Sequence, residues 1–241
     1  MLCNIKSMDQ KFVVIIPCFN ESKTILKVVK DIYELELDLK IFLIDDGSTD
    51  NFKNIDFSKY KSKIKIINHQ DNLGKGAAIK TGIKALEGFN VETKVILFDA
   101  DDEIDVEALP KILEMYNNNS DCKIIYGSRY LNKRINEYLN YGILRFFANK
   151  FLTTFINLRL GLKLTDMETA VKSFEYSLIK DKNIKSDGFE IEPEITLILH
   201  SQNLMFYEIP IKYQPRSKAE GKKISFFDGI KTIRYIYKNA R

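Results

Sequence analysis

Short apolar runs alternate with amphipathic segments through the first half of the chain, and this alternation limits the possible folds more than any other feature. The first two runs are almost wholly apolar, which is typical of a strand buried on both faces. The segments between the runs place apolar residues every three or four positions, as in a helix with one buried face. The pattern predicts an α/β fold with a mostly parallel central sheet and helices on both faces. The expected strands are Lys11–Ile16, which Pro17 ends, Ile41–Ile44, Ile64–Ile67, Val95–Phe98 and Ile124–Tyr126, and the expected helices are Asn20–Leu35 with Asn20 as N-cap, Lys75–Leu86 and Val106–Tyr116.

The second half of the chain is less regular but still mixes both kinds of element. Two of its helical segments are aromatic and basic, and one expected strand places Met205, Tyr207, Ile209, Ile211 and Tyr213 on one side. No internal repeat, linker or low-complexity stretch separates the halves, so we expect a single domain over residues 1–241, made of the halves 1–130 and 131–241. The expected elements are helices at 142–160, Glu192–Ser201 and Phe226–Lys238, and strands at Thr169–Phe174 and Leu204–Tyr213.

Composition excludes several classes of protein. The net charge of +4 is too mild to indicate a nucleic-acid partner. The three cysteines, Cys3, Cys18 and Cys122, are widely spaced and odd in number, which favours a reducing cytoplasm over a disulfide framework. The chain shows no signal peptide and no apolar run near the ~20 residues that span a bilayer. We therefore expect a cytoplasmic protein.

An acidic cluster follows directly on the expected strand Val95–Phe98. In an open α/β sheet, ligands bind just past the carboxyl ends of the strands. Asp99 and Asp101 point the same way if the segment is extended, so both can reach one ion, and hard oxygen ligands suit Mg²⁺ or Mn²⁺. Such an ion would bridge two phosphates of a nucleotide. The alternative is a solvated acidic turn that caps the next helix.

Two further segments have the composition of a nucleotide site. Asp45 and Asp46 end an apolar strand and precede a tight turn, where a carboxylate can accept hydrogen bonds from a base or a ribose. The loop Asn72–Ile79 places two glycines and Lys75 at a helix start, where free N–H groups suit an anion. Plain turn and helix-capping roles are the alternatives for both.

These motifs occur in a fixed order: Pro-Cys-Phe-Asn-Glu, Ile-Asp-Asp-Gly-Ser-Thr-Asp, Asn-Leu-Gly-Lys-Gly and Asp-Ala-Asp. The ordered set resembles glycosyltransferase family 2 over roughly the first 130 residues. The second half looks like the dolichyl-phosphate mannosyltransferase branch through Gly-Ser-Arg-Tyr (127–130), Leu-Thr-Asp-Met-Glu-Thr-Ala-Val-Lys-Ser-Phe (164–174) and Pro-Arg-Ser-Lys-Ala-Glu-Gly-Lys-Lys-Ile (215–224).

The resemblance implies the GT-A fold, a nucleotide-sugar donor such as a UDP- or GDP-sugar, and a bound Mg²⁺ or Mn²⁺. It implies that Asp99 and Asp101 hold the metal, with Glu103 joining them where the family often has Gln. Basic residues would hold the donor diphosphate and the acceptor phosphate, and the segment from Pro215 to Ile224 would close over the donor. The donor-binding residues implied are Pro17, Asn20, Glu21, Asp46, Lys75, Asp99, Ala100, Asp101, Arg216 and Lys222 (or Lys223), and Arg129 and Arg145 complete the basic set.

The resemblance also implies direct displacement at the anomeric carbon with inversion. A polyprenyl phosphate acceptor already carries an anionic oxygen and needs no base, whereas a saccharide hydroxyl acceptor needs one. Asp166 is the better candidate for that base and Glu168 the weaker one, with a turn-capping role as the alternative for Asp166. His69 and His200 lie in no motif.

The acceptor remains open between these two classes. Lipid-phosphate transferases of this branch commonly carry transmembrane helices, and this sequence shows none. The aromatic, basic helices at 142–160 and 226–238 could instead lie on a membrane surface, or could pack their apolar faces on the sheet. Two other hypotheses are a nucleotidylyltransferase, which the sequence after the first strand disfavours, and a non-catalytic nucleotide-sugar-binding module.

Overall fold

The computed structural model describes residues 11–132, 143–216 and 226–240. Within them the strands form a seven-stranded sheet in the order β3-β2-β1-β4-β6-β5-β7. Neighbouring strands are parallel except that β6 runs antiparallel to both β4 and β5. The predicted α/β fold with a mostly parallel sheet is confirmed. The strands are β1 Phe12–Cys18, β2 Lys40–Asp45, β3 Ile64–Asn68, β4 Lys94–Leu97, β5 Ile124–Ser128, β6 Lys172–Glu175 and β7 Phe206–Pro210.

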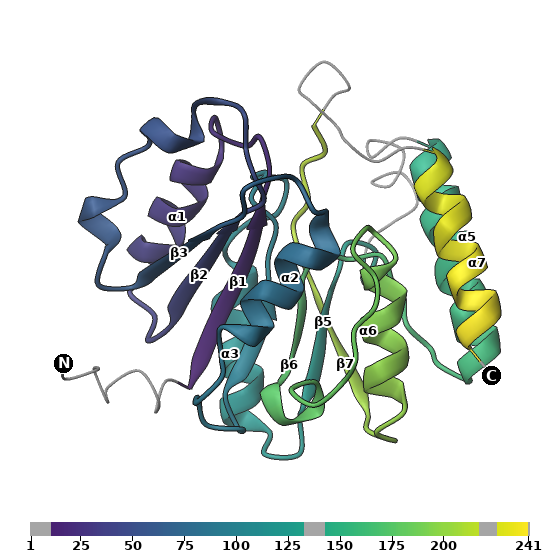
Figure 1. Ribbon diagram of the computed structural model, residues 1–241. Coiled ribbons are helices and arrows are strands. Elements are labelled where there is room, and N and C mark those ends of the chain that lie inside the picture. Colours follow the sequence, from purple (N-terminus) through teal and green to yellow (C-terminus); the bar gives the residue numbers. More distant parts are fainter. Residues whose placement is uncertain (1–10, 133–142, 217–225, 241) are drawn as a thin grey trace.

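Helices cover both faces of this sheet (Figure 1). α1 and α3 pack with one face, and α2, α6 and the pair α5 and α7 pack with the other. α5 and α7 lie side by side at one end of the molecule. The helices are α1 Ile25–Glu34, α2 Lys75–Lys84, α3 Ala108–Asn118, α5 Ile143–Leu160, α6 Ile191–His200 and α7 Phe226–Asn239.

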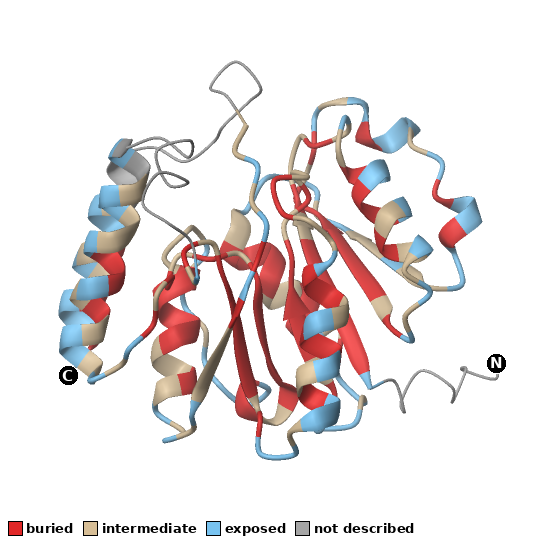
Figure 2. Cartoon of the chain, turned by 180° about the vertical axis from the view of Figure 1, so that it is seen from behind, coloured by how far each residue is buried: buried red, intermediate tan, exposed pale blue. Residues whose placement is uncertain are grey.

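The central strand β1 shows why the sheet is buried on both sides. Val14 and Ile16 join the apolar cluster under α1 and α3, whereas Val13 and Ile15 join the cluster under α2. All four are 0% exposed, and each buried side chain stabilises the fold by ~1.5–3 kcal/mol. Figure 2 shows this burial along the central strands of the sheet, whereas the outer faces of the helices and many loops are exposed.

Three local predictions were wrong. Pro17 does not end the first strand: it lies inside β1, beyond the last β1–β4 pair (Ile15 with Leu97), so its missing N–H removes no bond to β4. Asn20 is not the cap of α1, because the helix begins at Ile25 and Thr24 is its N-cap.

The strand predicted at Thr169–Phe174 begins only at Lys172, since the residues before it form a turn. The alternation predicted near the C-terminal end is confirmed for Tyr207, Ile209, Ile211 and Tyr213, which pack against one apolar cluster, although β7 itself ends at Pro210. Among the helices of the described ranges, none is both long and apolar enough to cross a bilayer.

Candidate active site

The loops that follow β1, β2 and β4 lie at one edge of the sheet, because the carboxyl ends of parallel neighbours lie at the same edge. Asn20 joins two of them. Its backbone N–H donates to Ser48 Oγ (2.9 Å), and its Oδ1 accepts from the N–H groups of Thr49 (2.7 Å) and Asp50 (3.2 Å). Asn20 has φ of 52°, a left-handed conformation that asparagine tolerates better than most residues. The Pro-Cys-Phe-Asn-Glu and Asp-Asp-Gly-Ser motifs are therefore parts of one structure.

The Asp46 carboxylate organises the neighbouring loop. Its oxygens accept from the N–H groups of Leu73 (3.0 Å) and Gly74 (2.8 Å), and Oδ1 lies 2.7 Å from His69 Nδ1. The other ring nitrogen of His69 lies 2.9 Å from Thr81 Oγ1. His69, which the sequence left without a role, thus ties β3 to α2.

The glycine-lysine loop was predicted to present free N–H groups, but four of these groups are engaged within the protein. The N–H groups of Gly76 and Ala77 donate to the Asp187 carbonyl (2.7 and 3.2 Å), and those of Leu73 and Gly74 are held by Asp46. A Cβ on Gly74, which has φ of 103°, would come 2.3 Å from Asp187 O. The glycines therefore allow the loop to pack closely on the segment before α6, and no anion is needed to explain them.

Lys75 turns away from its own loop and connects two carboxylates. Its Nζ lies 2.9 Å from Asp99 Oδ1 and 2.9 Å from Glu192 Oε1. Burial lowers the pKa of Lys75, but the attraction of Asp99 and Glu192 outweighs it and raises that pKa above its usual value. Glu192 also binds Lys172, whose Nζ donates to the Thr169 carbonyl (2.6 Å). A line of alternating charges, Asp99–Lys75–Glu192–Lys172, runs from the partly exposed Asp99 just past β4 through α2 and α6 to the buried Lys172 on β6.

Arg216 lies among three carboxylates from two other loops. Its guanidinium forms two hydrogen bonds to Glu21, Nη1–Oε2 at 2.7 Å and Nη2–Oε1 at 3.0 Å. Nη2 lies 3.5 Å from Asp101 Oδ2, Nε lies 3.6 Å from Glu103 Oε1, and the Arg216 N–H donates to Glu103 Oε1 (2.9 Å). The structure thus brings four of the residues predicted to form the donor and metal site into contact.

The acidic cluster has the chemistry of a cation site. Burial, together with the charges of Asp99 and Glu103, raises the pKa of Asp101 to about 7, although Arg216 and the Glu103 N–H oppose the shift. Repelled carboxylates of this kind fit a divalent ion bound by oxygen ligands. Within residues 11–132, 143–216 and 226–240, however, no three acidic, His or Cys side chains are already arranged around a metal position. The negative charge of Asp99 is offset by Lys75, and that of Asp101 is offset by Arg216.

Asp166, the predicted base, is fully buried and pairs with Arg129. The guanidinium binds it at two points, Nε–Oδ2 and Nη2–Oδ1, both 2.7 Å, and the Arg129 N–H donates to Oδ2 (3.0 Å). Both carboxylate oxygens are engaged, so this geometry orients Arg129 and does not present Asp166 as a base. The guanidinium of Arg129 also lies over the ring of Tyr213, with Cζ 5.3 Å from the ring centroid.

Glu168 differs from Asp166 in this respect. Its Oε1 is buried and has no hydrogen-bond partner among the described residues. Burial raises its pKa to about 7, and the charges of Glu192 and Asp166 contribute, while Lys172 and Arg129 oppose the shift. Sequence reasoning underestimated Glu168, which shares the motif 164–174 with Asp166, and missed Glu192, whose partners Lys75 and Lys172 stand in other segments of the chain.

The remaining predicted residues have simpler positions. The Ala100 carbonyl accepts from Thr24 Oγ1 (2.8 Å), which holds the Asp-Ala-Asp segment against the start of α1. Arg145 lies in α5, but its side chain falls outside the described residues, as do Lys222, Lys223 and the rest of 217–225. Pro215 and Arg216 are the described part of the segment predicted to close over the donor.

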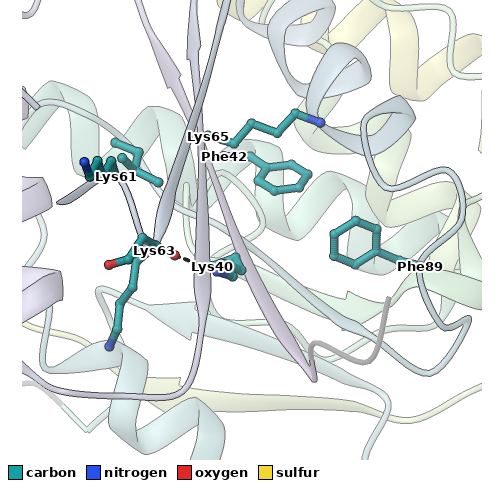
Figure 3. A pocket seen from close by; sticks show the side chains of 8 residues that line it. Lys40, Phe42, Lys61, Lys63, Lys65 and Phe89 are labelled. Carbon is teal, nitrogen blue, oxygen red and sulfur yellow. Dashed lines mark hydrogen bonds between the residues drawn. The ribbon is translucent and has the colours of Figure 1, made fainter. Parts of the chain in front are cut away.

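A hollow of about 220 Å³ lies elsewhere, at the amino-terminal ends of β2 and β3 (Figure 3). Phe42 and Phe89 pack there in an edge-to-face arrangement with ring centroids 5.8 Å apart. Lys40 and Lys63 also border it, but their ammonium groups donate to the carbonyls of Ser62 (2.6 Å) and Leu37 (2.8 Å). Ligands of open α/β sheets bind at the opposite edge, so we place the chemistry at the acidic cluster.

Comparisons with known proteins identify relatives of this chain. Residues 13–181 match the sequence model of Glycosyl transferase family 2. The chain is 31% identical over 225 residues to an uncharacterised protein of Methanocaldococcus jannaschii, covering 90% of this chain and 87% of that protein. It is 27% identical over 234 residues to the UDP-N-acetylglucosamine–dolichyl-phosphate N-acetylglucosaminyltransferase of Methanococcus voltae, covering 90% and 91%.

Among solved structures, the chain resembles glucosyl-3-phosphoglycerate synthase from Mycobacterium tuberculosis in complex with Mn²⁺, UDP and glucosyl-3-phosphoglycerate. The TM-score is 0.66 at 14% identity, over 96% of this chain and 80% of that one. At this identity the likeness concerns the fold alone, which is the GT-A fold.

Proposed function

We propose that this chain, which belongs to glycosyl transferase family 2 and is a hexosyltransferase, moves a sugar from a nucleotide-sugar donor to a polyprenyl phosphate. Relatives named as acting on dolichyl phosphate support this acceptor class, including the Methanococcus voltae enzyme, which covers nearly the whole chain. The observation that carries the proposal is the position of α5, whose one side borders the Arg129–Asp166 pair while another exposes a continuous apolar stripe.

The contact between α5 and the site is direct. Lys150 donates to the Thr165 carbonyl (3.3 Å), next to Asp166, and Asn149 donates to the hydroxyl of Tyr130 (3.0 Å), next to Arg129. Leu152 and Ile156 bury a second side of the helix in the apolar cluster. The position of α5 is therefore fixed relative to the residues proposed to bind the acceptor.

The exposed stripe follows the helical repeat. Leu144, Phe147, Phe151 and Leu158 are 85%, 63%, 58% and 79% exposed, and at 100° per residue they fall on one narrow face. α7 packs beside α5 and exposes Lys231, Arg234 and Lys238. Arg159, near the end of α5, donates to the Ala240 carbonyl (Nε, 2.9 Å) at the end of α7. An apolar stripe beside a basic helix fits the surface of an anionic bilayer.

A divalent Mg²⁺ or Mn²⁺ would be held by Asp99 and Asp101, with Glu103 as a third candidate. When bound, such an ion would stabilise the negative charge that develops on the leaving diphosphate. Glu21 and Asp101 would then contact the ion and the donor instead of Arg216. The Arg216 guanidinium would become available to bind the phosphate oxygens. Lys75 stays beside Asp99 throughout, because Glu192 holds its ammonium group in that position.

The acceptor oxygen forms a bond to the anomeric carbon while the bond from that carbon to the diphosphate oxygen breaks, with inversion. The electron pair leaves with the diphosphate. Because a phosphate acceptor is already anionic, no group has to remove a proton from it. Arg129, oriented by Asp166 and packed against Tyr213, would bind the acceptor phosphate as a rigid fork.

Transfer assays test the proposal. A panel of radioactive UDP- and GDP-sugars is offered with a short polyprenyl phosphate, with the matching free polyprenol and with soluble saccharides. We expect transfer to the phosphate but not to the alcohol. Efficient transfer to a saccharide hydroxyl, with none to the lipid phosphate, would replace the proposed acceptor.

A further inference from the structure

The direction of β6 brings the segment that contains Glu168 to the same edge of the sheet as the acidic cluster. β6 is antiparallel to β4, and Lys172 stands opposite Leu97, the last residue of β4. The chain that precedes Lys172 therefore passes the end of β4 from which Asp99 and Asp101 follow. Glu168 lies in this chain, four residues before Lys172, in the turn that leads into the strand.

The groups around Glu168 are already engaged with one another. Asp166 is bound at two points by Arg129, and the Thr169 carbonyl accepts from Lys172, which also binds Glu192. The described residues contain two buried side-chain atoms without a hydrogen bond, Arg216 Nε and Glu168 Oε1, and of these only Glu168 Oε1 belongs to this group. A buried polar atom left unpaired is unfavourable, so it calls for an explanation, and a bound ligand is one.

The charges that face Glu168 come from every element around it. Glu192 on α6 and Asp166 on its own segment disfavour its ionised form, and Lys172 on β6 and Arg129 after β5 favour it. Burial is the largest influence, and the pKa of about 7 means that the carboxyl is half protonated near neutral pH. In its protonated form it has one O–H to donate.

We propose that Glu168 contacts the acceptor directly: its protonated carboxyl donates a hydrogen bond to an acceptor phosphate oxygen, and its ionised form repels that phosphate. The inference rests on the proposed function, because it assumes a phosphate acceptor. Glu168 keeps its proton during transfer, since the attacking oxygen is already anionic and the electron pair departs with the diphosphate. The carboxyl therefore selects the acceptor and is not a base.

The test compares the wild-type protein with Glu168→Gln over pH 6 to 8, at saturating donor and varied polyprenyl phosphate. The amide is nearly isosteric, donates a hydrogen bond at every pH and cannot ionise. The acceptor phosphate and Asp101 titrate in both proteins, so the wild-type/variant ratio of kcat/KM for the acceptor isolates Glu168. We expect this ratio to fall about tenfold from pH 6 to pH 8, mainly through the acceptor KM, with the donor KM alike in both.

The other outcomes are distinct. A ratio that is flat with pH, while both proteins transfer to the lipid phosphate, overturns the inference and leaves the proposed function intact. A ratio that rises with pH, or a folded Glu168→Gln variant that binds donor but transfers nothing, makes Glu168 a base. If neither protein uses the lipid phosphate while both transfer to a saccharide, the proposed function fails and this inference fails with it. Circular dichroism and donor binding establish that the variant is folded.

Discussion

Arg216 and Glu21 are separated by 195 residues in the sequence, yet their side chains meet in a two-point ion pair with contacts of 2.7 and 3.0 Å. The same guanidinium lies 3.5 Å from Asp101. Side-chain hydrogen bonding to Glu21 raises the pKa of Arg216, which therefore stays charged. Arg216 therefore ties the start of the segment from Pro215 to Ile224 to the loops that follow β1 and β4.

Arg216 should therefore compete with a divalent ion for Asp101. We expect Arg216→Gln to bind Mn²⁺ roughly tenfold more tightly than the wild type in the absence of donor, while transferring sugar more slowly. Electron paramagnetic resonance of free Mn²⁺ measures the first effect. The titration belongs at pH 8.5, because Arg216 lowers the pKa of Asp101 and its removal raises it. Equal or weaker Mn²⁺ binding at that pH would show that Arg216 does not occupy the cation site.

Asp99→Asn and Asp101→Asn should each reduce transfer on the order of a hundredfold or more while leaving the fold intact. Both carboxylates stand past a strand end and are partly exposed, so they serve a ligand and not the core. Glu114→Gln, on the exposed side of α3, is the matched control. Near wild-type turnover of either aspartate variant with Mg²⁺ or Mn²⁺ present would move the metal site elsewhere.

The charge line through α6 should contribute to stability as well as to the site. Glu192→Gln leaves Lys172, which is 0% exposed, without its carboxylate partner, and breaking a buried pair in this way costs ~3–5 kcal/mol. Urea denaturation gives the free energy of unfolding. Glu34→Gln, which removes an exposed pair with Lys30 at 3.7 Å, should cost under ~0.5 kcal/mol. A similar loss in both variants would mean that the charge line contributes little.

Acidification should stabilise the metal-free protein between pH 8 and pH 5. Asp101 and Glu168 have folded-state pKa values of about 7 against usual values of 3.8 and 4.5. In this window the folded state binds more protons than the unfolded state, so the free energy of unfolding falls as pH rises through 7. Urea midpoints in chelator should be higher at pH 5.5 than at pH 8. The double variant Asp101→Asn, Glu168→Gln should flatten this dependence, and an unchanged slope would refute the assignment.

The apolar stripe on α5 should carry membrane binding. Wild-type protein is expected to sediment with anionic liposomes and to be released by high salt, and Phe147→Ser with Leu158→Ser should reduce binding at least tenfold. Met205→Ser removes an equally exposed apolar side chain (68%) far along the chain and serves as control. If the α5 variant sediments as the wild type does, the stripe has another purpose.

Much of this architecture could be predicted from local sequence. Short apolar runs identified the strands of the first half, and Asp99 and Asp101 were identified as a site because they directly follow one. The wrong predictions concern hydrogen bonds and ion pairs between residues that lie far apart in the sequence. The free N–H groups expected at Gly76 and Ala77 are taken by Asp187, which lies more than a hundred positions along the chain. Glu192 was not singled out, because only the folded chain brings it to Lys75.

Asp166 illustrates the same limit. The motif that contains it indicates chemistry, but the motif cannot show whether the carboxylate faces a substrate or an arginine. The two-point bond from Arg129 decides this, and it depends on β5 and β6 being neighbours. Glu168, only two residues away, has the unpaired oxygen instead. Spacing along a turn does not determine which of two acidic side chains is engaged.

The reversed direction of β6 has a consequence for how such a protein can change. Had β6 run parallel to β4, the turn before it would open at the opposite edge of the sheet, and Glu168 would stand a full strand length from Asp99. Because it runs antiparallel, the turn is fastened on both sides, by Asp166 to Arg129 and by Lys172 to Glu192, while the side chain at 168 bonds to neither. If Glu168 contacts the acceptor as proposed, a single substitution at that position would change which acceptor the protein uses and leave the donor-binding residues in place.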